Sequence, residues 1–254
     1  MSGIKKKLQF TFDLKRLHPL VQGIDKRIPY IWVVSRAFFS KQHRYCYFRL
    51  PKCANSTVTK TLAFYDNSIH FDPNDPSGEQ TKKHYSNLLA TGCITQTSLL
   101  KNYFCFTVVR DPYARLLSAY LDRIESKLDA RRYDQAREAI RKTQAGQGEL
   151  NFAGFVEYLE QGGLYADSHW CPQSALLPVD SKQLHFIGKV ENLEQDLKHI
   201  VDNIFGEGVY NAPQQRSHNK THALDKLASY YTPELKKRVY HLFEQDFVTF
   251  DYLP

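Results

Sequence analysis

The order of apolar and polar positions predicts strands that alternate with helices along most of the chain. Three short apolar runs have the length and the composition of buried strands, and they span residues 45–48, 103–109 and 184–188. Apolar residues at helical spacing follow each run. Helices are expected at 56–64, 84–90, 112–124, 131–142, 152–159, 192–203 and from residue 233 onward. This order favours an α/β fold with a central parallel sheet flanked by helices.

The helix that follows the second strand has the clearest start. Asp111 is suited to accept hydrogen bonds from the first free N–H groups, and Pro112 suits the first helical position. The charged run 131–142 is expected as an exposed helix or a mobile insertion. Residues 1–43 are weakly patterned and are expected as an N-terminal arm that packs on a single domain of residues 44–254.

Composition and charge narrow the class of partner. The chain has 254 residues, of which 42% are hydrophobic and 13% aromatic, so it can bury a sizeable core. Its formal net charge is +7, which favours an anionic partner such as a nucleotide, an acidic glycan, a nucleic acid or a membrane surface. A basic surface without a specific partner remains the alternative.

The cysteines and the N-terminus favour a soluble, cytoplasmic protein. None of the five cysteines forms a C-x-x-C pair, which argues against a zinc ribbon. An odd number without a disulfide-like framework suits a reducing compartment. No secretory signal or transmembrane run is visible, although the basic arm leaves a peripheral contact with a membrane open.

Residues 51–57, PKCANST, have the composition of a phosphate-binding loop, and we name them the first loop. A loop between a strand end and a helix start directs several N–H groups and the helix dipole at one point. Lys52 adds a full positive charge, and Ser56 and Thr57 add hydroxyl donors. The order of residues differs from that of a Walker A loop. The alternative is an ordinary helix cap.

Arg110 and Ser118 suggest a second anion site. Arg110 stands at the carboxyl end of the second strand, where open α/β sheets bind ligands, and its planar fork suits a phosphate. Ser118 lies on the helix that follows. A surface ion pair and a surface serine are the alternatives. Two anion sites predict a ligand with two phosphate-like groups.

These segments carry a resemblance to a known family. YFRLPKCANST resembles the loop that binds the 5′-phosphosulfate in sulfotransferases, and FTVVRDPYARLLSAY resembles their segment for the 3′-phosphate. The chain is most similar to the carbohydrate sulfotransferase group (sulfotransferase family 2) that includes the chondroitin 4-O-sulfotransferases and the HNK-1 sulfotransferase. Residues 152–159, 167–170, 186–194 and 239–252 extend the likeness in the same order. It implies a P-loop-NTPase-like sulfotransferase fold in a soluble, bacterial member.

The resemblance implies a donor, an acceptor and a set of site residues. The donor is 3′-phosphoadenosine 5′-phosphosulfate (PAPS), no metal is required, and the acceptor is a carbohydrate hydroxyl. The residues implied for the 5′ side are Lys52, Cys53, Ala54, Asn55, Ser56 and Thr57, with Lys52 also stabilising the leaving phosphate. Those implied for the 3′-phosphate are Arg110 and Ser118, and those for a segment that closes over the nucleotide are Arg216 and Lys220.

Two histidines are candidates for the general base, and two other functions are compatible with the sequence. His84 lies between the two phosphate segments and is the first candidate for the base, with His169 as its rival. Trp170 either stacks on a sugar or packs in the core. A P-loop-like nucleotide kinase or phosphotransferase and a non-enzymatic polyanion binder are the alternatives, and no nucleic-acid module is recognised. The sequence does not give the oligomeric state.

Overall fold

The fold is built on a five-stranded mixed sheet. The computed structural model describes residues 24–72, 75, 78–87, 95–126, 130–211 and 223–254. The strands are β1 (Ala37–Ser40), β2 (Tyr45–Phe48), β3 (Ser86–Asn87), β4 (Phe104–Val109) and β5 (Phe186–Lys189), in the order β3-β1-β2-β4-β5. β2, β4 and β5 are parallel, which confirms the predicted central parallel sheet. β1 is antiparallel to β2 and was not predicted.

Helices cover both faces of this sheet. On one face, Tyr45 and Tyr47 of β2 pack with α3 (Asn55–Tyr65) and α9 (Leu193–Phe205). On the other, Cys46 and Phe48 pack with α2 (Tyr30–Val34) and α5 (Gln96–Asn102). Successive side chains of a strand point to opposite faces, so a strand that is buried on both sides is apolar throughout.

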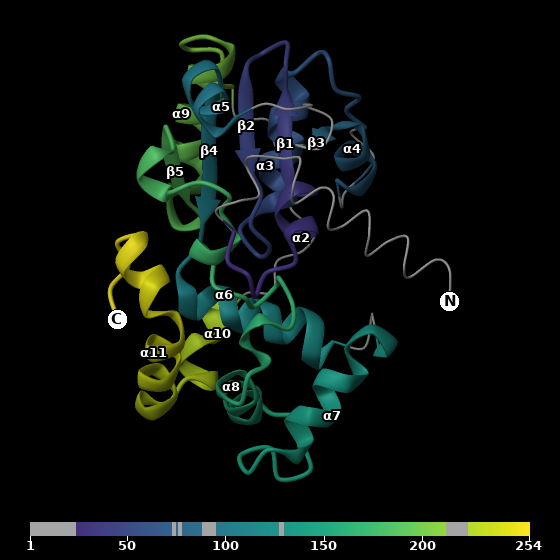
Figure 1. The fold of residues 1–254 in the computed structure, drawn as a ribbon, viewed down its shortest axis with the longest axis vertical. Helices are drawn as coiled ribbons and strands as arrows, with labels where there is room; N and C mark the ends of the chain where they lie inside the picture. The colour runs from purple at the N-terminus through teal and green to yellow at the C-terminus, as the bar shows by residue number, and fades with distance from the viewer. Residues whose placement is uncertain (1–23, 73–74, 76–77, 88–94, 127–129, 212–222) are drawn as a thin grey trace.

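A second, helical core lies beyond the carboxyl ends of β2 and β4 (Figure 1). Its helices are α6 (Pro112–Ala119), α7 (Asp134–Lys142), α8 (Phe152–Glu160), α10 (Ala223–Tyr230) and α11 (Pro233–Thr249). Every residue of α6 is buried because this helix lies between the sheet and the other helices. Trp170 packs in this core, and its indole N–H donates to the carbonyl of Gly163 at 2.9 Å, which confirms its core interpretation.

Short helical turns connect the longer elements. A π-helical turn, Tyr120–Glu125, continues α6 directly. Single 3₁₀ turns span Ala130–Tyr133, Gly163–Tyr165, Ser174–Leu176, Ser181–Gln183 and Val190–Asn192. None of the helices within the described ranges has the length and the apolar run that a membrane span needs.

Two predicted elements differ from the structure. The helix expected at 84–90 is wrong over its described part, because α4 (Glu79–His84) ends where it was expected to begin. Gly78 starts α4 earlier, at a left-handed φ of 69°, and β3 follows the helix. Within the charged run 131–142, α7 is a helix from Asp134 onward, but Arg137 is buried and donates to the carbonyl of Ile124 at 2.8 Å.

The predicted N-terminal arm contributes to the core. α2 and β1 both lie within residues 1–43, and Val34 and Ala37 are fully buried. The division at residue 43 into an arm and a domain stays a prediction, and residues 1–23 lie outside the described part of the chain.

Candidate active site

The structure brings the first loop and Arg110 together. β2 and β4 are parallel neighbours in which Phe48 pairs with Thr107, so the segments after them leave the sheet side by side. The hydroxyl of Thr107 donates to the carbonyl of Phe48 at 2.7 Å. The guanidinium of Arg110 reaches the first loop, where its Nη1 lies 3.4 Å from the carbonyl oxygen of Lys52. The two predicted anion sites therefore adjoin each other.

The backbone of the first loop has two left-handed residues. Lys52 has a φ of 69° and Ala54 has a φ of 53°, values that are uncommon for residues with a side chain. Such conformations cost roughly 1–3 kcal/mol each and cluster at functional sites. α3 begins after Ala54 without a side-chain cap, so its first N–H groups are available to an anion.

The polar side chains at the start of α3 have different environments. Asn55 accepts a hydrogen bond from the hydroxyl of Tyr47 at 3.1 Å. Ser56 accepts one from the ammonium of Lys82 at 3.3 Å. Thr57 is half-buried, and its side chain makes no hydrogen bond to another described residue. Lys82 was missed because no local pattern indicates that α4 packs beside α3.

Two arginines near the loop have buried donors without partners in the described part of the chain. The Nε atoms of Arg49 and Arg110 are inaccessible to solvent and make no hydrogen bond to a described residue. Burial lowers the pKa of both side chains. An unpaired guanidinium N–H away from water is costly unless an acceptor reaches it. These residues therefore fit an anionic group such as a phosphate.

Lys52 is paired with a carboxylate that the sequence analysis did not single out. Its Nζ lies 2.9 Å from Oδ2 of Asp122, which stands in the π-helical turn. Nε of Arg123 lies 3.0 Å from the same oxygen. Burial lowers the pKa of Lys52, and its ion pair with Asp122 opposes this effect. Burial disfavours the ionised form of Asp122, but Lys52 and Arg123 outweigh it and the pKa is lowered.

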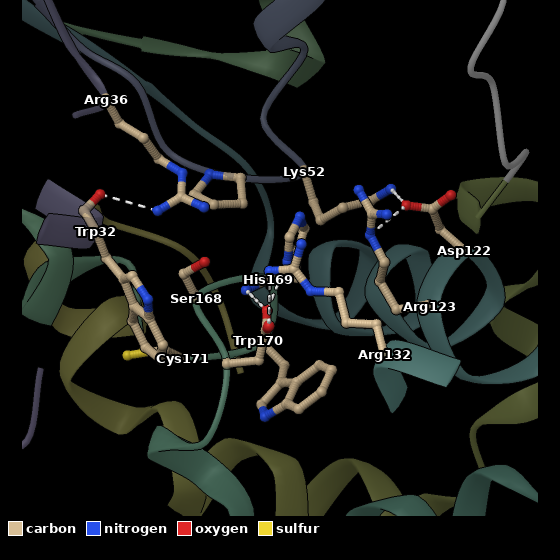
Figure 2. A network of polar contacts seen from close by, with 12 residues as sticks. Trp32, Arg36, Lys52, Asp122, Arg123, Arg132, Ser168, His169, Trp170 and Cys171 are labelled. Carbon is tan, nitrogen blue, oxygen red and sulfur yellow. Dashed lines mark hydrogen bonds and ion pairs between the residues drawn. The ribbon is translucent and has the colours of Figure 1, made fainter. Parts of the chain in front are cut away.

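His169 lies beside this ion pair. Its Nδ1 is 2.5 Å from Oδ1 of Asp167, whose other oxygen lies 3.7 Å from Arg132. Burial lowers the pKa of His169, with Asp167 opposing the shift, so the ring is neutral at pH 7. Nδ1 is then assigned the proton that it donates to Asp167, and Nε2 is left as the acceptor. Figure 2 shows Arg36, Lys52, Asp122, Arg123, Arg132 and His169 converging from different parts of the chain.

The other predicted histidine has a different environment. His84 is exposed at the end of α4, and its ring centre lies 5.0 Å from that of His70. Within the described residues His84 makes no hydrogen bond to the first loop. The geometry therefore favours His169 over His84 as a proton acceptor.

Gln173, which was not predicted from the sequence, connects Arg110 with the first loop. Its Oε1 accepts from the backbone N–H of Arg110 at 3.0 Å and from the thiol of Cys53 at 3.1 Å. Its Nε2 donates to the carbonyl of Arg110 at 2.9 Å. The backbone N–H of Gln173 donates to the buried carboxylate of Asp246 in α11 at 2.7 Å. A single buried amide thus fixes Arg110 relative to the first loop.

Arg115 makes a second buried connection. Its guanidinium donates to the carbonyls of Pro51 at 3.0 Å, Cys171 at 2.8 Å and Ser168 at 3.2 Å. It therefore ties the first loop to the segment that carries His169. Cys53 is fully buried, and burial raises its pKa to about 11, so it has the environment of a structural thiol.

Three predicted site residues remain. Ser118 is buried within α6, the helix that begins two residues after Arg110. Arg216 and Lys220 lie outside the described residues.

Comparison with known proteins identifies the class. Residues 35–253 match the sequence profile of the Sulfotransferase family, and the chain belongs to this family. This finding confirms the resemblance seen in the two short segments. No solved structure matches the chain.

Three relatives illustrate the similarity. Carbohydrate sulfotransferase 10 of Xenopus laevis is 27% identical over 242 residues, covering 87% of this chain and 68% of that protein. Carbohydrate sulfotransferase 14 of Mus musculus is 29% identical over 178 residues, covering 64% and 45%. Carbohydrate sulfotransferase 8 of Mus musculus is 25% identical over 250 residues, covering 86% and 57%. The chain thus spans about two thirds of the first relative and about half of the other two.

Proposed function

We propose that this protein transfers a sulfuryl group from PAPS to a hydroxyl of a carbohydrate. The observation that carries the proposal is the junction of Lys52 and Arg110 at the carboxyl ends of two neighbouring parallel strands. Membership of the Sulfotransferase family and the names of the relatives support it. When bound, PAPS supplies the sulfuryl group and a 5′-phosphate leaving group.

The residues of the chain have distinct roles in this proposal. The first loop, with Lys52 and the start of α3, holds the 5′ side of the donor. Arg110 holds the 3′-phosphate, and its buried Nε supplies a donor that none of the described residues uses. Fixed positive charge stabilises the charge that develops on the leaving group, and it costs no reorganisation during the reaction.

We propose His169 as the general base. The acceptor hydroxyl gives its proton to Nε2, while Nδ1 keeps its proton and donates to Asp167. Asp167 orients the ring and stabilises the positive charge that the ring acquires. The low pKa of His169 keeps the ring neutral, as a base must be, at physiological pH.

Binding of 3′-phosphoadenosine 5′-phosphate (PAP) tests the donor assignment. Calorimetry should show that the wild-type protein prefers PAP to ATP and AMP. Lys52→Ala and Arg110→Ala should each lose PAP affinity by tenfold or more while the melting temperature stays near that of the wild type. Lys142→Ala, which removes an exposed charge on α7, is the matched control.

Transfer itself is tested with labelled PAPS and a panel of glycans. Incorporation of label into a glycan supports the proposal. A preference for ATP with magnesium would indicate a phosphotransferase instead. Binding of oligonucleotides with steep salt dependence and no nucleotide preference would indicate a polyanion binder.

A further inference from the structure

The carboxylate of Asp122 forms an ion pair with Lys52, the residue to which we assign binding of the donor. Unlike Arg49 and Arg110, Lys52 has a carboxylate partner among the described residues. The side chain of Lys52 is only 12% exposed, so water screens this pair poorly. An ion pair in such surroundings is strong enough to affect the binding of another anion at the same ammonium.

A bound donor and Asp122 make competing demands on Lys52. The oxygens of a carboxylate and of a phosphosulfate are both anionic acceptors for the same three ammonium N–H groups. Placed together around one Nζ, the two anions would repel each other at short range. The interaction with Asp122 must therefore weaken when a donor anion approaches Lys52.

The structure provides a second partner for Asp122. Oδ2 of Asp122 is shared between Lys52 at 2.9 Å and Arg123 at 3.0 Å. If Lys52 turns away, Arg123 keeps the carboxylate paired, which avoids the high cost of a partly buried charge without a partner. Asp122 and Arg123 both lie in the π-helical turn, a helix irregularity that is frequent at functional sites.

We propose that Asp122 is an internal counter-anion for Lys52. It pairs with the ammonium of Lys52 when no donor is bound, and it pairs with Arg123 alone when the donor binds Lys52. This inference rests on the proposed donor site. It makes Asp122 a positioning residue that weakens nucleotide binding and favours release of the product, PAP. Its removal should increase affinity, whereas loss of a residue that supports binding would decrease it.

Calorimetric titration with PAP tests the proposal through binding alone. Asp122→Asn should bind PAP roughly tenfold more tightly than the wild type, because one hydrogen-bonded ion pair no longer competes. Arg123→Gln should bind it several-fold more weakly, since Asp122 then has Lys52 as its partner. Asp134→Asn is the matched control, because it removes an exposed carboxylate that pairs with Arg137 at 3.5 Å. Its affinity should stay within twofold of the wild type.

The double variant separates this role from a direct contact of Arg123 with the nucleotide. If Arg123 acts through Asp122, the variant with both Asp122→Asn and Arg123→Gln should bind PAP as tightly as Asp122→Asn alone. Weaker binding by Asp122→Asn with an unchanged melting temperature would overturn the inference. An equal gain in Asp134→Asn would also overturn it. Absence of PAP binding by the wild type would overturn the proposed function as well, so the two failures are distinguishable.

Discussion

Replacing Gln173 by leucine should disconnect the two halves of the donor site. The change keeps a side chain of similar size but removes the acceptor for the Arg110 N–H at 3.0 Å and the donor to its carbonyl at 2.9 Å. A buried group left without a partner costs about 1–3 kcal/mol. Two such groups give a loss of about 3 kcal/mol in the free energy of unfolding. For a chain of this size we expect the melting temperature to fall by roughly 6–12 °C.

The functional effect should depend on whether a ligand spans both sites. PAP contacts both the first loop and Arg110 in our proposal, whereas AMP lacks the 3′-phosphate. A small displacement of Arg110 should therefore lower the affinity for PAP roughly tenfold and the affinity for AMP less than twofold. Both affinities are measured by calorimetry well below the melting temperature. Gln161→Leu is the control, because Gln161 is exposed and, among the described residues, its side chain bonds only to Glu157. Equal losses for PAP and AMP in Gln173→Leu would refute the reasoning.

Three further predictions concern the base, the buried arginine and the thiol. His169→Gln should reduce the transfer rate by roughly 10²–10⁴-fold with PAP affinity unchanged, and in the wild type the rate should fall only below pH 6.5, as a pH–rate profile would show. Arg115→Met, which removes three hydrogen bonds to buried carbonyls, should cost about 3 kcal/mol in chemical denaturation. Cys53, with its pKa raised to about 11, should resist iodoacetamide in the native protein at pH 8, as judged by mass spectrometry. Full transfer by His169→Gln, native stability of Arg115→Met or rapid alkylation of Cys53 would contradict the respective assignment.

The features that were predictable from the sequence depend on local signals. The strand β4 and the helix after it were predicted because an apolar run, a capping aspartate and a proline occur in succession. The side chain of Asp111 does accept from the N–H of Ala114 at 2.8 Å. β1 is as short as β2 but was missed, because no Gly, Pro, Asn or Asp marks its ends, whereas Pro51 follows β2.

The residues that were missed depend on contacts between distant parts of the chain. Gln173 is 63 positions from Arg110 and 73 from Asp246, and no periodicity connects such positions. Asp122 was more accessible to prediction. It follows Ser118 by four positions on the same predicted helix, so the two share a helix face.

The left-handed residues of the first loop have a consequence for binding entropy. Lys52 and Ala54 have left-handed backbone angles, and buried hydrogen bonds from Arg115 to Pro51 and from Cys53 to Gln173 hold the loop around them in this conformation. The free-energy cost of these backbone angles is therefore offset by contacts that form when the protein folds. Capture of an anion needs to immobilise little more than side chains, so more of the contact energy remains as affinity.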